Sequence, residues 1–110
     1  MSLTTTEAEQ YIRLTLKQWG MSHVKIEWME GNTFLGLANP WIGRLKLNTK
    51  ILNRFSLFHE VLKHEIVHFI QFKRNGNKFL KVNGRWSYHG ADFKAICKEM
   101  NIPARTRIPI

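Results

Sequence analysis

The run from Ser56 to Lys73 constrains the fold most, because it is apolar, compatible with a helix and carries a histidine pair. It contains His64-Glu65-Ile66-Val67-His68, which reads H-E-x-x-H. In a helix the two histidines are about 6 Å apart along the axis, and their rings project from one face. That spacing lets two imidazole nitrogens reach one Zn²⁺ ion at roughly 2.0–2.1 Å. The alternative is a chance pair on an exposed helix face, since only three positions define the motif.

Glu65 follows the first histidine directly, so it would border a bound metal without necessarily binding it. A carboxylate in that position can take a proton from water at the metal, which is the role of a general base. The motif therefore predicts His64 and His68 as metal ligands and Glu65 as a catalytic residue. A catalytic zinc usually has three protein ligands and one open position, so the chain must supply a third ligand.

Several candidates for the third ligand fit poorly. The metzincin spacing fails, since Gln71 and Arg74 stand where Gly and His would be needed. An acidic ligand on a later helix would have to be Glu99, the only glutamate after the motif. His23 lies far upstream at the start of a predicted strand, and His59 lies about 140° around the helix from the first histidine of the motif.

His89 is the remaining histidine that the chain can bring to the motif. Twenty residues separate it from His68, and a hairpin among them would turn the chain back toward the metal. The alternative is a histidine near a helix start with no metal. Asp92 is either a hydrogen-bond acceptor behind a ligand or a first-turn acid favoured by the helix dipole.

Hydrophobic periodicity predicts three helices and two groups of strands. Thr4 and Glu7 form a capping box before an amphipathic stretch, and Asn83-Gly84 is a strong signal for a two-residue hairpin turn. Alternating apolar residues predict strands, and the short loops between three of them predict an antiparallel meander. The expected helices cover about 5–19, 56–74 and 90–100, the strands about 23–29, 33–38 and 41–48, and the hairpin about 79–88.

These elements predict an α+β fold in a single domain over residues 1–110. We expect a small antiparallel three-stranded sheet packed on two to three helices, with the hairpin between the active-site helix and the last helix. The apolar face of the active-site helix is broad, which indicates a helix buried between the sheet and another element. Residues 102–110 are expected to form an extended basic end.

The charge of the chain favours acidic partners. There are 17 Lys and Arg against 8 Asp and Glu, a net charge of +9. Such an excess points to nucleic acid, although a basic surface without a ligand gives the same count. The single cysteine, Cys97, cannot form an internal disulfide and is expected in the core. With no signal peptide and no apolar run of about eighteen residues, we expect a cytoplasmic or nucleoid-associated protein without membrane contact, its oligomeric state left open.

Three segments occur in order: Gly43-Arg44-Leu45-Lys46-Leu47-Asn48, Val61-Leu62-Lys63-His64-Glu65-Ile66-Val67-His68 and His89-Gly90-Ala91-Asp92-Phe93-Lys94. Together they resemble the SprT-like zinc metalloprotease domain of the Spartan-type DNA–protein crosslink proteases. In that family a strand ending in Leu-Asn precedes the H-E-x-x-H helix, and H-G-x-x-F carries the third ligand. The resemblance covers about residues 34–101 and implies a compact zincin-like domain. By this resemblance His64, His68 and His89 would bind Zn²⁺, and Glu65 would be the general base.

The resemblance implies a zinc-dependent endopeptidase that hydrolyses protein substrates, including proteins bound or crosslinked to DNA. Many relatives carry a C-terminal zinc ribbon that is not found here, so DNA contact is expected on the basic domain itself. Arg85, Trp86 and Tyr88 on the hairpin are candidates for that contact, and Tyr88 or Arg85 for a transition-state donor. The alternative is a non-catalytic, zinc-containing basic module that binds nucleic acid or a protein partner, including a viral or mobile-element effector. A fourth protein ligand, Cys97 or Asp92, would favour that alternative.

Overall fold

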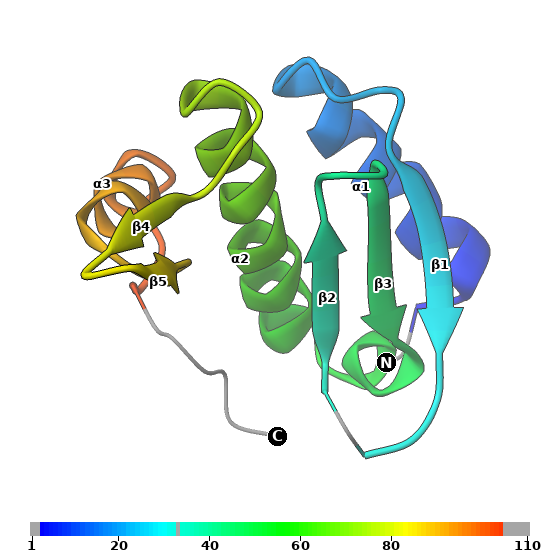
Figure 1. The fold of residues 1–110 in the computed structure, drawn as a ribbon. Coiled ribbons are helices and arrows are strands. Elements are labelled where there is room, and N and C mark those ends of the chain that lie inside the picture. Colours follow the sequence, from blue (N-terminus) through cyan, green and yellow to red (C-terminus); the bar gives the residue numbers. More distant parts are fainter. Residues whose placement is uncertain (1–2, 33, 105–110) are drawn as a thin grey trace.

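The computed structural model describes residues 3–32 and 34–104 of the chain. The predicted α+β class is confirmed: three α-helices and one 3₁₀-helix accompany a small three-stranded sheet and a separate hairpin in this part of the chain (Figure 1). The elements are α1 (Thr5–Gln18), β1 (Lys25–Met29), β2 (Gly36–Asn39), β3 (Arg44–Asn48), η1 (Thr49–Asn53), α2 (Phe55–Arg74), β4 (Leu80–Val82), β5 (Arg85–Ser87) and α3 (Ala91–Glu99). Of the predicted basic end, residues 105–110 lie outside the described residues.

The sheet is mixed, so the predicted antiparallel meander is wrong. The strand order is β1-β3-β2, with β1 parallel to β3 and β2 antiparallel to it. Strand β3 pairs with both other strands and so lies in the middle of the sheet, where its Leu45 and Leu47 are fully buried. The chain therefore passes from β1 to the far edge, forms β2 there, and returns through β3 between them (Figure 1). Short loops reverse the chain direction, but they do not require that successive strands be neighbours.

The first helix begins at the predicted capping box. The Thr4 side chain accepts a hydrogen bond from the Glu7 backbone N–H, and the Glu7 carboxylate accepts one from the Thr4 backbone N–H, each at 3.1 Å. These bonds satisfy two donors that a helix start otherwise leaves unpaired. Ala8, Ile12 and Leu16 are fully buried, so α1 covers the core with its predicted apolar stripe.

Helix α2 is the central helix of the fold. It contacts β2 and η1 on one side and α3 on the other, so it lies between the sheet and the last helix (Figure 1). This explains its broad apolar face, because both sides of the helix are covered. Eleven of its residues are buried, including Phe58, Leu62 and Ile66, which are 0% exposed.

The hairpin brings the chain back from the end of α2 to the start of α3. Val82 pairs with Arg85 across the turn, and Asn83 and Gly84 have positive φ of 53° and 78°. Both central residues of a type I′ turn need positive φ, which explains the Asn-Gly pair. No helix among the described residues is long and apolar enough to cross a membrane.

Candidate metal centre

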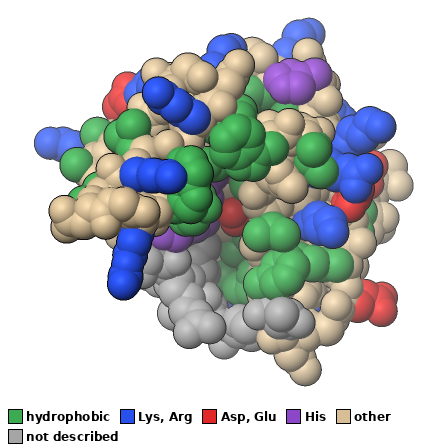
Figure 2. Space-filling view, viewed as in Figure 1, with side chains coloured by type: hydrophobic (Ala, Val, Ile, Leu, Met, Phe, Trp, Pro, Cys, Tyr) green, Lys and Arg blue, Asp and Glu red, His purple; other side chains and the backbone are tan. Residues whose placement is uncertain are grey.

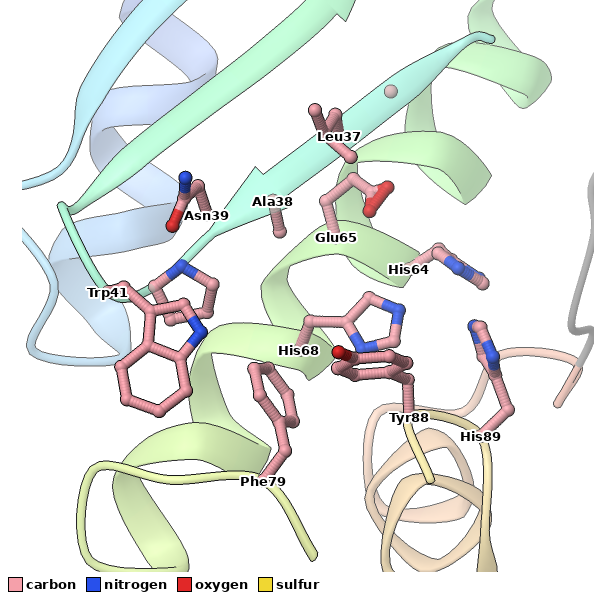
Figure 3. Close-up of a pocket in the computed structure, with 12 residues that line it drawn as sticks. Leu37, Ala38, Asn39, Trp41, His64, Glu65, His68, Phe79, Tyr88 and His89 are labelled. Carbon is pink, nitrogen blue, oxygen red and sulfur yellow. The ribbon is translucent and has the colours of Figure 1, made fainter. Parts of the chain in front are cut away.

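Three histidines predicted from the sequence come together between α2 and α3. His64 and His68 project from α2, and His89 lies just before α3, where the hairpin returns the chain (Figure 3). The ring centroids of His64 and His68 are 5.1 Å apart, those of His64 and His89 5.5 Å, and those of His68 and His89 4.9 Å. One ring nitrogen from each residue lies within 4.8 Å of the other two.

The three nitrogens fit a single metal ion after a small movement. Tetrahedral ligands at 2.0–2.1 Å lie roughly 3.3 Å apart, so the nitrogens must approach one another by up to about 1.5 Å. Nε2 of His89 is buried and has no hydrogen-bond partner among the described residues. An orphaned acceptor of this kind is costly unless something is bound to it. The donor set is three imidazoles, which suits zinc and several other transition metals.

Burial keeps the histidines in the form that binds metal. The pKa values of His64 and His68 are lowered to about 4, in both cases chiefly because burial penalises the charged ring. The neighbouring histidines lower the pKa of His64 further, and the hydrogen bond to Gln71 opposes the shift at His68. Burial also lowers the pKa of His89. The rings are therefore neutral near pH 7 and each offers a lone pair.

Phe93 packs against all three imidazoles, a contact that sequence reasoning did not foresee. Its fully buried ring has centroid distances of 5.2 Å to His64, 5.0 Å to His68 and 4.7 Å to His89. It lies four residues after His89, so one turn of α3 brings it beside the histidine at the helix start. The apolar ring limits the orientations that the imidazoles can adopt.

Glu65 lies beside the histidines and against the edge of the sheet. Its side chain is 6% exposed, and burial raises its pKa to about 8, opposed by a hydrogen bond from the Ala38 backbone. Gly36 makes room for it: a Cβ there would lie 2.9 Å from Val61 Cγ1 and 3.1 Å from Glu65 Cγ. A Cβ at these distances would force the Val61 and Glu65 side chains to shift, so the absence of a side chain at residue 36 lets strand β2 lie close to α2.

A cleft of about 480 Å³ opens over these groups. Strand β2 and Trp41 form one wall, and Phe79, Tyr88 and His89 form the other, with Glu65 and the α2 histidines between them (Figure 3). Figure 2 shows hydrophobic side chains on both sides of the hollow, with histidine and acidic side chains visible inside it. Of the two suggested transition-state donors, Tyr88 lines the cleft and Arg85 does not.

The residues set aside in the sequence lie outside the cluster. His59 shares a 3.1 Å hydrogen bond with Tyr11, and Glu99 forms an exposed ion pair with Arg74. Cys97 is buried in the core. Asp92 accepts hydrogen bonds from Gln71 and Asn75 rather than facing the metal position. Among the described residues, no fourth His, Cys, Asp or Glu joins the three histidines.

The family model of the SprT-like family matches residues 5–110. The chain belongs to the SprT-like family. The resemblance seen in residues 34–101 is thus confirmed and extends to the first helix. No curated protein and no solved structure matches the chain. Membership of the SprT-like family and the histidine cluster together are compatible with a metal-binding, metalloprotease-like domain.

Proposed function

We propose that this SprT-like chain is a zinc-dependent endopeptidase, with His64, His68 and His89 as the metal ligands and Glu65 as the general base. The observation that carries the proposal is the convergence of three neutral imidazoles beside one buried carboxylate in an open cleft. Catalytic zinc sites have three protein ligands and an open position, whereas structural sites are closed by a fourth. The absence of a fourth ligand among the described residues supports the enzyme over the non-catalytic module.

A bound zinc ion would supply a Lewis acid that polarises a peptide carbonyl and makes water acidic enough to lose a proton near pH 7. Glu65 would take that proton and later give it to the leaving amine. Burial raises the pKa of Glu65, and a bound cation close by would lower it again and keep the carboxylate ionised, ready to accept a proton. The hydrogen bond from Ala38 and the close approach of Gly36 hold the carboxylate at one end of the cleft.

The substrate would bind as an extended chain along β2. This strand is the edge of the sheet and lines the cleft, so half of its backbone groups face away from β3. An extended peptide can pair with such an edge and add a strand to the sheet. Backbone pairing would place a peptide bond close to Glu65 with little dependence on side-chain sequence.

Proteins bound to or crosslinked to DNA are the substrates that we propose. The chain carries a net charge of +9, and the hairpin presents Arg85 and Trp86 to solvent. Lys81 Nζ lies 4.6 Å from the centroid of the Trp86 ring. Basic groups beside an exposed aromatic ring suit contact with phosphates and unstacked bases.

The test is proteolysis by zinc-loaded protein, with Glu65→Gln as the comparison. Wild type is expected to cleave an unfolded protein such as casein, and to cleave a DNA-bound protein faster than the same protein without DNA. Glu65→Gln is expected to lower the rate by roughly 10²–10⁴-fold, the usual value of a general base. Unchanged proteolysis in the Gln variant would show that Glu65 is not the base. No acceleration by DNA would contradict the proposed substrate class alone.

A further inference from the structure

A chain of side-chain hydrogen bonds, buried at His68 and partly buried at Asp92, runs from His68 to the start of α3. His68 Nδ1 lies 3.1 Å from Gln71 Oε1, and Gln71 Nε2 donates to Asp92 Oδ2 at 2.9 Å. Asn75 Nδ2 donates to the same Asp92 oxygen at 3.0 Å. Gln71 is 0% exposed, the most deeply buried of the polar residues on α2. A buried amide is costly unless it is paired, and this one is paired at both ends.

The chemistry of the groups fixes the direction of these bonds. A carboxylate only accepts hydrogen bonds, so the Gln71 amide must turn its NH₂ group toward Asp92. Its carbonyl oxygen, which also only accepts, then faces His68 Nδ1. The proton between them must therefore be on the imidazole. A neutral imidazole carries one N–H, so His68 Nε2 is left with a free lone pair.

We propose that Gln71 and Asp92 act as positioning residues that hold His68 in the Nδ1–H tautomer, so that Nε2 is presented to the metal. The inference rests on the proposed metal site and deepens it. Hydrogen-bond partners behind a metal-binding histidine orient the ring and raise its basicity. His64 has no hydrogen bond from its ring among the described residues, so this support is specific to His68.

We call the hydrogen bonds that run from His68 through Gln71 to Asp92 the relay; they also join the two helices that bring the ligands together. Asp92 is in the first turn of α3, three residues after His89, while Gln71 and His68 are on α2. The Arg74–Glu99 ion pair links the same two helices at an exposed position, with both side chains 50% exposed. That pair touches none of the histidines in the cluster, which makes it a matched control for a purely structural link.

The test combines the histidine tautomer with zinc affinity. In metal-free protein near pH 7.5, imidazole ¹⁵N NMR is expected to show His68 as Nδ1–H. Gln71→Leu and Asp92→Leu are expected to give mixed tautomers and a loss of roughly 10–100-fold in zinc affinity. Asp92→Asn keeps an oxygen for both donors, so it is expected to stay close to wild type. Glu99→Gln is expected to change neither reading.

These results distinguish control of the His68 tautomer from two other roles of Gln71 and Asp92: a role in folding and a charge effect at the start of α3. A helical circular dichroism spectrum like that of wild type shows that a variant has folded. If folded Gln71→Leu keeps the wild-type tautomer and zinc affinity, the relay is wrong while the peptidase proposal stands. If Asp92→Asn behaves like Asp92→Leu, Asp92 acts through its charge at the start of α3 and the relay is contradicted. The tautomer measurement needs no metal, so it decides the relay even if the proposed enzymatic activity fails.

Discussion

At the scale of one residue, the position of the Glu65 carboxylate depends on its neighbour Gly36. The H-E-x-x-H spacing predicts a carboxylate at the metal, but not the space that it occupies. That space exists because residue 36 has no side chain and because β2 passes close to α2. The position of the Glu65 carboxylate, the proposed general base, therefore depends on a glycine 29 positions earlier in the chain.

Gly36→Ala is expected to lower proteolysis while leaving zinc binding in place. The added methyl group would lie 2.9 Å from Val61 Cγ1, 3.1 Å from Glu65 Cγ and 3.2 Å from Glu65 Oε2, so both side chains must shift. A misplacement of about 1 Å in a reacting group can cost roughly 100-fold in rate, and the smaller shift needed here is expected to cost less than that. The measurement is proteolysis per bound zinc. An active variant at wild-type rate would show that the carboxylate position is not limiting.

The sequence predicted which side chains come together at the cleft far better than it predicted the residues that pack against them. His64, Glu65 and His68 follow from spacing on one helix, and His89 followed because few other histidines were available. Phe93 and Gln71 act through contacts between α2 and α3, which a single sequence does not reveal. The one sequence signal for Gln71 is that an uncharged polar residue continues the stretch from Ile66 to Ile70, in which every residue is buried.

At the scale of elements, α2 and β3 are the central helix and the central strand of the fold. The sequence predicted the central place of α2 but not that of β3. The long apolar face of α2 predicted a helix covered on both sides, and the structure confirms it. For the sheet, turn residues and alternation indicated the strands, but not which strand lies in the centre. Strand β3 is the central strand, and its Leu45 and Leu47 are fully buried against the core.

Leu47→Ala is expected to destabilise the protein much more than Leu37→Ala. Leu47 is 0% exposed on β3, and truncating a buried leucine costs about 2–5 kcal/mol. Leu37 on the edge strand β2 is 45% exposed, and changes at such surface sites are usually within about 0.5 kcal/mol. Urea unfolding of both variants measures the difference. Equal losses would contradict the central position of β3.

At the scale of the whole molecule, burying the site makes stability depend on pH. His64 and His68 have pKa values lowered to about 4 from a usual 6.5, so protonation favours the unfolded chain. The free energy of unfolding therefore falls as the pH drops below 6.5, and this loss is complete below about 4. Glu65 acts in the opposite sense, because burial raises its pKa from 4.5 to about 8 in the folded chain. Its contribution to the free energy of unfolding is therefore lost as the pH rises from 4.5 through 8.

Metal-free protein is therefore expected to be most stable near pH 6.5 to 7. Below that range the unfolded chain binds more protons than the folded chain, because two histidines take up protons on unfolding and only Glu65 releases one. Above it the histidines are neutral in both states, and the loss of the Glu65 proton on unfolding lowers the stability as the pH rises. Urea unfolding in the presence of a chelator measures the curve. Glu65→Gln is expected to remove the fall between about pH 7 and 8 and to keep the fall at acid pH. A wild-type curve that is flat from pH 5 to 8 would contradict the burial of these groups.

Zinc-edge X-ray absorption of the protein loaded with one equivalent of zinc tests the central claim most directly. The claim is that His64, His68 and His89 form an open metal site rather than a closed structural one. The expected spectrum contains three imidazole ligands and no sulfur, and His89→Ala is expected to reduce the imidazole count or lose the zinc. Four protein ligands, a sulfur ligand from Cys97, or a spectrum unchanged in His89→Ala would contradict the claim.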